Sequence, residues 1–207
     1  MTKKKIIGLG GDGTLLLKGP DGREERVLPL CAQPLGTVYL LIDCSESMAG
    51  EKLNQARSGA GDFILRALAK GYGAGLISFD DHASVLVPRS LNYHDFEGPL
   101  ARLDAGGTTN LTQALSLALL ALLNVEGPRF VVVVSDGTPD VPDSALAAAQ
   151  KLATAGVQLI TIATQDADTT FLAGIATTRD LAVIVRPDQL KLGISNTVLA
   201  LPLIRGQ

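Results

Sequence analysis

Three short segments carry oxygen-bearing side chains at spacings that could bind a metal ion. The string DCSES places Asp43, Ser45 and Ser47 at alternate positions. The string GGTTN, residues 106–110, supplies two threonine hydroxyls, and Asp136 lies in SDGTPD. Alternate side chains of an extended turn face the same way, so the first segment brings one carboxylate and two hydroxyls together. Such ligands suit a small hard cation. We predict Mg²⁺, with Mn²⁺ as the second candidate, because zinc would require Cys or His.

Apolar runs and helical periodicities predict the elements that must position these side chains. The strand-like runs span residues 38–42, 74–79, 130–134, 157–163 and 181–185. Because the runs are continuous rather than alternating, we expect parallel strands buried on both faces. Helical spacing of apolar residues predicts helices over residues 51–70, 111–123 and 144–156. Gly156 closes the last of these helices, and residues 84–88 form a short edge strand that ends at Pro88.

The predicted fold is α/β, with a doubly wound, mainly parallel sheet between layers of helices. Such sheets bind ligands beyond the carboxyl ends of the strands, between the first and fourth strands of the order 3-2-1-4-5-6. Residues 38–42 are the first strand and residues 130–134 the fourth, so Asp43 and Asp136 reach the same edge. Two adjacent carboxylates repel each other without a cation. This favours a metal site over a helix cap for Asp43 and a turn residue for Asp136.

The N-terminal residues raise a separate question. The string GGDGT, residues 10–14, is similar to the phosphate-binding string of the NAD kinase and diacylglycerol kinase families. A phosphate-binding loop uses a following helix N-terminus, but the proline and glycine of PDG leave too few residues for a helix. We predict a β-hairpin with GGDG as its turn and a third strand near residues 25–30. Residues 1–35 then form an N-terminal β-hairpin extension, and residues 36–207 form the main domain. If GGDGT binds phosphate instead, the alternative function is a nucleotide kinase.

Composition restricts the partner and the compartment. The 207 residues are 46% hydrophobic and 19% charged, which suits one α/β domain with a small appendage. A formal charge of −3 without a basic run argues against nucleic acid and anionic membranes as partners. The start, MTKKK, is followed by no signal-peptide cleavage site, and the longest apolar run is too short to span a bilayer. Cys31 and Cys44 form neither a disulfide framework nor a metal pair, so we expect a cytoplasmic protein.

The three oxygen-bearing segments together resemble the von Willebrand factor type A (vWA) domain with its metal-ion-dependent adhesion site (MIDAS). The matching strings are LLIDCSESMAGEKL, GGTTNLTQAL and VVVVSDGTPD, in family order. The resemblance covers roughly residues 36 to 205. It implies a metal site formed by Asp43, Ser45, Ser47, a threonine and Asp136, the last acting directly or through water. Thr109 is favoured because T-N-L-x-x-A-L fits the family spacing, whereas G-G-T would select Thr108.

The resemblance also implies a function. Members of the family use the metal to accept a carboxylate from a protein partner. Asp43 and Asp136 carry two negative charges that a divalent cation neutralises, so only the loaded site accepts this carboxylate. The chain lacks the disulfides that large secreted members of the family carry near the domain ends. In this it is similar to the intracellular bacterial branch, whose members act as adaptors beside MoxR-type AAA+ ATPases or beside kinase–phosphatase sets. Glu46 departs from the family, which commonly has a small residue there. It either faces solvent and repels the partner's carboxylate, or turns inward as the sixth ligand.

A metal-dependent hydrolase is the other enzymatic alternative. It would use Asp80, Asp81 and His82 as further ligands or as a base, whereas the simpler interpretation makes them solvated loop residues. The sequence places no general base or nucleophile next to the two aspartates. Cys44 lacks a candidate base and is expected to be packed rather than nucleophilic. We therefore predict an interaction module without enzymatic activity.

Overall fold

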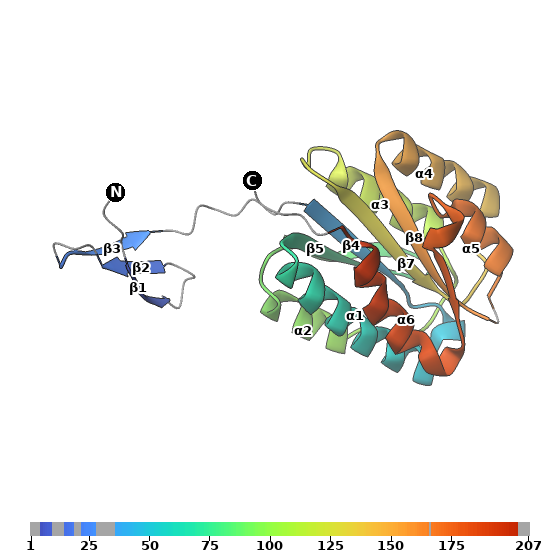
Figure 1. The fold of residues 1–207 in the computed structure, drawn as a ribbon. Coiled ribbons are helices and arrows are strands. Elements are labelled where there is room, and N and C mark those ends of the chain that lie inside the picture. The colour runs from blue at the N-terminus through green and yellow to red at the C-terminus, as the bar shows by residue number, and fades with distance from the viewer. Residues whose placement is uncertain (1–4, 10–14, 19–21, 28–35, 166, 203–207) are drawn as a thin grey trace. The chain divides into compact units, whose positions relative to one another are not determined.

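The computed structural model describes residues 5–9, 15–18, 22–27, 36–165 and 167–202 (Figure 1). The chain divides into two compact units, Met1–Gln33 and Pro34–Gln207. Across the described residues, no helix has the length and apolar character needed to cross a membrane.

The N-terminal unit contains a small antiparallel sheet. Its strands are β1 (Lys5–Leu9), β2 (Leu15–Lys18) and β3 (Glu24–Val27), in the order β1-β2-β3. The pairing of β1 with β2 agrees with the predicted hairpin, although the predicted GGDG turn and Cys31 lie outside the described residues. A strand follows the GGDGT string at the point where a phosphate-binding loop would use a helix N-terminus.

The main unit is built on one six-stranded sheet with the order β6-β5-β4-β7-β8-β9. The strands are β4 (Gly36–Asp43), β5 (Tyr72–Phe79), β6 (Ala83–Ser90), β7 (Arg129–Ser135), β8 (Val157–Thr164) and β9 (Ala182–Val185). Neighbouring strands pair in parallel except β5 and β6, which are antiparallel. This is the predicted order 3-2-1-4-5-6, in which the first strand, β4, lies next to the fourth, β7.

The edge strand β6 differs from its prediction at one end. Its position at the sheet edge is as predicted, but it continues past Pro88 to Ser90. The register with β5 is irregular there, since Ala74 is opposite Ser90 and Leu76 is opposite Val87. Proline lacks a backbone N–H, and an edge strand tolerates this loss because one of its sides has no partner strand.

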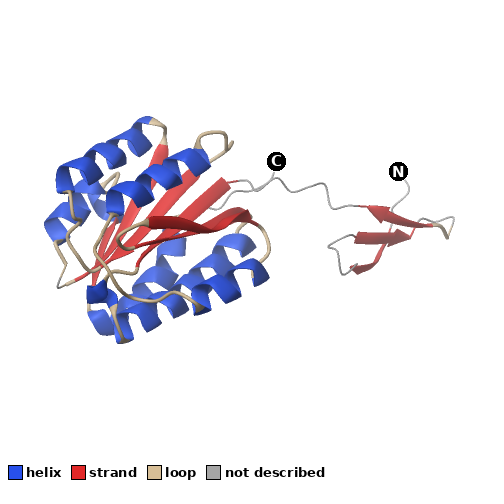
Figure 2. Ribbon diagram, turned by 180° about the vertical axis from the view of Figure 1, so that it is seen from behind, coloured by secondary structure: helices blue, strands red, loops and turns tan. Residues whose placement is uncertain are grey.

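Helices cover both faces of the sheet (Figure 2). The core on one face includes residues of α1 (Glu51–Ala69), α2 (His94–Ala101) and α6 (Leu190–Thr197). The core on the other face includes residues of α3 (Leu111–Leu122), α4 (Pro142–Thr154) and α5 (Thr169–Ile175). The helices α1, α3 and α4 correspond to the predicted ones. The fold is therefore the α/β architecture that the sequence predicts.

The differences among the helices have local causes. Helix α4 begins at Pro142, earlier than predicted, because proline suits the first turn of a helix. Gly156 follows α4 with a φ of +74°, as the predicted terminating residue requires. Helices α2, α5 and α6 were not predicted. They have eight, seven and eight residues, too few for the periodicity of the sequence to identify them.

Candidate metal centre

Asp43 ends β4 and is completely buried. Its Oδ1 accepts a hydrogen bond from the Ser45 N–H at 2.8 Å, and its Oδ2 accepts one from Ser135 Oγ at 2.5 Å. Burial raises the pKa of Asp43 to about 6, although these hydrogen bonds oppose the rise. The two hydrogen-bond donors are electrically neutral and do not cancel the charge of the carboxylate. A nearby cation would do so and would favour the ionised form of Asp43.

The two serines lie in the turn between β4 and α1. The backbone is extended at Ser45 but enters a 3₁₀ turn at Glu46–Met48, so the predicted extended turn does not reach Ser47. The hydroxyl oxygens of Ser45 and Ser47 nevertheless lie 3.1 Å apart. Ser47 Oγ also donates to Oδ1 of Asp136 at 2.7 Å. The turn therefore brings both hydroxyls to the carboxyl end of the sheet, where Asp136 follows β7.

Thr109 is the buried threonine of the GGTTN segment, with 7% of its surface exposed. A Cβ built on Gly137 would lie 3.6 Å from Thr109 Oγ1 and 3.8 Å from Ser47 Oγ, so both hydroxyls lie beside the same point. Thr108 is exposed, and its hydroxyl donates to Asp140 Oδ2 at 2.7 Å. The geometry favours Thr109 over Thr108 as the residue that faces the site.

Two further aspartates hold this threonine segment in place. Asp140 Oδ1 accepts a hydrogen bond from the Thr109 N–H at 3.0 Å, and Asp81 Oδ1 accepts one from the Thr108 N–H at 2.7 Å. The latter bond lowers the pKa of Asp81. Asp81 and His82 are exposed loop residues, as predicted, whereas Asp80 is half-buried. Asp81 also anchors the site loop. The role of Asp140 was not predicted, although its sequence signal was present in the string SDGTPD.

Lys52 is a site residue that the sequence analysis did not identify. Its Nζ forms an ion pair with Oδ2 of Asp136. The side chain of Asp136 is fully buried, and that of Lys52 is 21% exposed. The only sequence signal was the position of Lys52 at the start of α1, directly after the DCSES turn. The charge count from two aspartates and one metal ion was therefore incomplete, because Lys52 adds a positive charge.

Two neighbours of the serines are not positioned for chemistry. Glu46 is exposed and its backbone N–H donates to the Gly107 carbonyl at 3.2 Å, which agrees with the solvent-facing alternative. Cys44 is 2% exposed, and its carbonyl accepts a hydrogen bond from the Gly106 N–H at 2.8 Å. Burial raises the pKa of the Cys44 thiol to about 12. The thiol is therefore a packed side chain rather than a nucleophile near neutral pH.

The donors at the carboxyl ends of β4 and β7 fit a hard divalent cation. We call this group the metal rim, and it consists of Asp43, Ser45, Ser47, Thr109 and Asp136. All of its side-chain donors are oxygen atoms, which Mg²⁺ and Mn²⁺ prefer. Within the described part of the chain, no three His, Cys, Asp or Glu side chains form a group that could hold a metal. A cation at the metal rim must therefore use hydroxyls as well as carboxylates, and Asp80, Asp81 and His82 form no separate centre.

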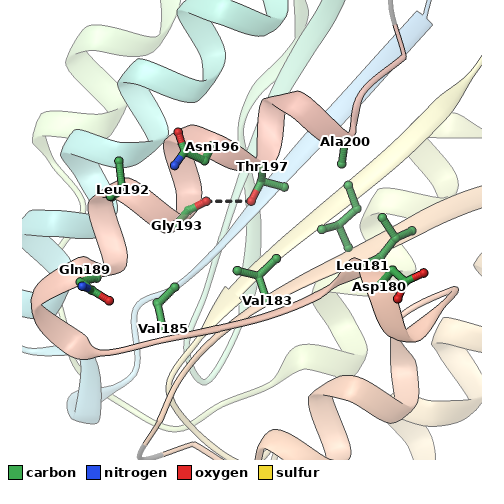
Figure 3. Close-up of a pocket in the computed structure, with 11 residues that line it drawn as sticks. Asp180, Leu181, Val183, Val185, Gln189, Leu192, Gly193, Asn196, Thr197 and Ala200 are labelled. Atoms are coloured by element: carbon green, nitrogen blue, oxygen red, sulfur yellow. Dashed lines mark hydrogen bonds between the residues drawn. The ribbon is translucent and has the colours of Figure 1, made fainter.

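A cavity of about 340 Å³ lies between β9 and α6 (Figure 3). Its lining includes the apolar residues Leu181, Val183, Val185 and Leu192. The hydroxyl of Thr197 is already bonded to the Gly193 carbonyl at 2.8 Å within α6. The cavity contains no residue of the metal rim and offers packing surface rather than metal ligands.

Comparison with known proteins identifies sequence and structural relatives. A UPF0353 protein from Mycolicibacterium paratuberculosis is 31% identical over 144 residues, which are 60% of this chain and 43% of that protein. The chain thus spans less than half the length of this curated relative. The vWF domain of the type V pili tip protein Mfa5 from Porphyromonas gingivalis superposes with a TM-score of 0.76 at 14% identity, covering 83% of this chain and 97% of that one.

Two further solved structures with the same fold are described with a metal. Proximal thread matrix protein 1 from the mussel byssus, with a zinc-occupied MIDAS motif, has a TM-score of 0.68 at 18% identity and covers 82% of this chain and 46% of its own. Manganese-loaded TRAP from Plasmodium vivax has a TM-score of 0.66 at 18% identity, with coverages of 82% and 75%. At these identities the likeness shows the fold alone.

A family model also matches most of the main unit. The von Willebrand factor type A domain family matches residues 37–193. This range contains the whole metal rim and extends from β4 into α6. The sheet order and the structural neighbours agree with this match, and the chain belongs to the von Willebrand factor type A domain family.

Proposed function

We propose that this chain is a metal-dependent protein-interaction module that binds a carboxylate of a protein partner. The metal ligands in this proposal are Asp43, Ser45, Ser47, Thr109 and Asp136. The observation that carries the proposal is the meeting of two strand-end carboxylates with three hydroxyls at one edge of the sheet. When bound, the cation supplies positive charge and a coordination position for an external oxygen ligand.

Mg²⁺ is the proposed metal, with Mn²⁺ as the second candidate. The support is chemical, because the side-chain donors of the metal rim are all carboxylate or hydroxyl oxygens. The zinc of the byssus protein and the manganese of TRAP belong to those proteins. The zinc-occupied MIDAS motif of the byssus protein supports a divalent cation at this place in the fold, and the choice among metals rests on the ligands of this chain.

The module is proposed to have no enzymatic activity. Cys44 is buried with a pKa raised to about 12 by that burial, which removes it as a nucleophile. His94 is exposed on α2, where its Nδ1 lies 2.8 Å from Glu97 Oε2. His82 lies on an exposed loop. These positions support binding rather than acid–base chemistry at the metal rim.

The proposed partner supplies an acidic residue. As the family resemblance implies, this partner is a MoxR-type AAA+ ATPase or a member of a kinase–phosphatase set, and the proposed compartment is the cytoplasm. The exposed carboxylate of Glu46 lies next to the metal rim in the sequence and would repel an incoming carboxylate. Glu46→Gly should therefore tighten binding of the acidic partner while leaving the Mg²⁺ affinity nearly unchanged.

Calorimetric melting in EDTA and in saturating Mg²⁺ tests the metal. A ligand at a hundred times its dissociation constant stabilises a protein by about 2.7 kcal/mol, which raises the melting temperature of a domain this size by roughly 5–10 °C. Asp43→Ala and Asp43→Asn should abolish this shift. The matched control is Glu126→Ala. Glu126 is exposed and precedes β7, at the amino ends of the strands and away from the metal rim. Equal melting temperatures of the wild type in EDTA and in Mg²⁺ would refute the metal site.

A further inference from the structure

The carboxylate of Asp136 has a partner at each oxygen. Oδ1 accepts a hydrogen bond from Ser47 Oγ at 2.7 Å, and Oδ2 is ion-paired with Lys52 Nζ. The Asp136 side chain is fully buried, and that of Lys52 is mostly buried. The negative charge of Asp136 is therefore balanced by an ammonium group from α1.

Asp43 is held in a different way. Its carboxylate accepts hydrogen bonds from the Ser45 N–H and from Ser135 Oγ, which are both neutral donors. Neutral donors orient a carboxylate but do not cancel its charge. The two aspartates of the metal rim thus differ in their bonding partners. Asp136 is paired with a charged group of the protein, whereas the two hydrogen bonds to Asp43 come from neutral groups.

We infer that Lys52 is an internal counter-cation that competes with the bound metal for Asp136. The inference rests on the proposed function, in which a divalent cation binds at the metal rim. Like charges repel each other more strongly where little water separates them, so Lys52 opposes a second cation at the same carboxylate. The ion pair also stabilises the metal-free protein, because without Lys52 the buried Asp136 would lose its charge partner.

Both effects have the same consequence. Lys52 stabilises the metal-free state more than the loaded state and thereby lowers the metal affinity. It also sets the charge of the metal rim. Two carboxylates and one ammonium leave a net negative charge in the metal-free state, and a divalent cation makes the net charge positive. Lys52 therefore strengthens the contrast by which a loaded rim attracts a carboxylate and an empty rim repels it.

Substitutions of Lys52 separate this role from a general effect of charge. Lys52→Met removes the ammonium and retains most of the side-chain length. Lys52→Gln is a second neutral variant for the case in which the methionine variant does not fold. Lys52→Arg retains the charge. Lys151→Met is the matched control. Lys151 is an exposed residue of α4, and its substitution changes the net charge by the same amount as Lys52→Met.

The test measures Mn²⁺ affinity by titration of the full chain and melting temperature in EDTA. We expect Lys52→Met and Lys52→Gln to bind Mn²⁺ roughly tenfold more tightly, within the usual range of coupling between sites. They should melt at a lower temperature than the wild type in EDTA and show a larger shift with metal. The increase in affinity should shrink at high salt, because salt screens charges that remain partly exposed to water. Lys52→Arg and Lys151→Met should resemble the wild type.

The possible failures are distinguishable. A wild type that binds Mn²⁺, with neutral Lys52 variants that bind it equally or more weakly, would overturn the counter-cation role and leave the proposed function standing. A wild type that binds neither Mn²⁺ nor Mg²⁺ would overturn the proposed function and the inference together. An equal increase in affinity for Lys151→Met would show that net charge alone is responsible, which also contradicts the inference.

Discussion

The hydroxyl of Ser135 donates a 2.5 Å hydrogen bond to Oδ2 of Asp43 and joins the ends of two adjacent parallel strands. The register explains this contact, because Ile42 of β4 is opposite Val134 of β7 and the next residues of both strands are Asp43 and Ser135. The bond orients one carboxylate of the metal rim. Sheet pairing therefore builds part of the site.

Loss of this hydroxyl should destabilise the protein. Ser135→Ala leaves a buried carboxylate oxygen without one of its donors, and this should cost about 1–3 kcal/mol. Urea unfolding in EDTA measures the effect without a contribution from metal binding. The control is Ser116→Ala, because Ser116 is exposed on α3 and its hydroxyl donates to the Thr112 carbonyl. Its effect should stay within about 0.5 kcal/mol. Equal urea midpoints for Ser135→Ala and the wild type would contradict the prediction.

The two threonines of GGTTN should differ in their effect on metal affinity. Thr109→Val removes the hydroxyl that lies beside Gly137 and Ser47, so it should weaken Mn²⁺ binding by about tenfold or more. Thr108→Val removes an exposed hydroxyl that bonds to the side chain of Asp140, and it should have a smaller effect. Titration calorimetry compares both variants with the wild type. A larger loss for Thr108→Val than for Thr109→Val would reverse the assignment.

Packing between α1 and α6 should depend on Gly59. Replacement of a helical glycine by alanine usually stabilises by about 0.5–1 kcal/mol. A Cβ at Gly59, however, would lie 2.9 Å from the Lys191 carbonyl oxygen and 3.0 Å from Ile194 Cβ. Gly59→Ala should therefore destabilise the fold by about 1–3 kcal/mol through overpacking. Gly174→Ala in α5 is the control, since a Cβ there would meet nothing within 4 Å and should be neutral or stabilising. Thermal unfolding measures both, and a stabilised Gly59→Ala variant would show that the helices separate without cost.

His94 should titrate above the ordinary histidine pKa. The hydrogen bond and the charge of Glu97 raise the pKa of His94 above its usual 6.5. A pKa that is raised in the folded state contributes stability at low pH, and this contribution is lost as the pH rises through the folded-state pKa. Glu97→Gln should move the pKa of His94 down and reduce that pH dependence, with the charge of Asp95 still raising the pKa. NMR titration of the imidazole protons measures the pKa directly, and an unchanged value in the variant would exclude Glu97 as the cause.

The sequence alone determined the mainly parallel sheet and the end of the sheet at which the metal rim lies. Continuous apolar runs such as residues 130–134 record burial on both faces, which is a local property that the chain carries before it folds. Polar residues placed directly after two such runs identified Asp43 and Asp136 as neighbours, because the carboxyl ends of parallel strands meet at one edge. The family resemblance favoured Thr109 over Thr108 through the spacing of GGTTN to the following helix, and Thr109 is buried in the structure.

Tertiary structure decided the partners of those residues. The ion pair between Lys52 and Asp136 depends on where the first turn of α1 lies against the end of β7, and no local pattern encodes that position. Likewise, the anchoring of the threonine segment by Asp81 and Asp140 joins three separate loops. The short helix α6 appears only because residues such as Ile194 gain burial against α1 and the sheet. Contacts between residues far apart in the sequence form only when the packed sheet and helices hold them at bonding distance, so their energies leave no period or motif in the chain.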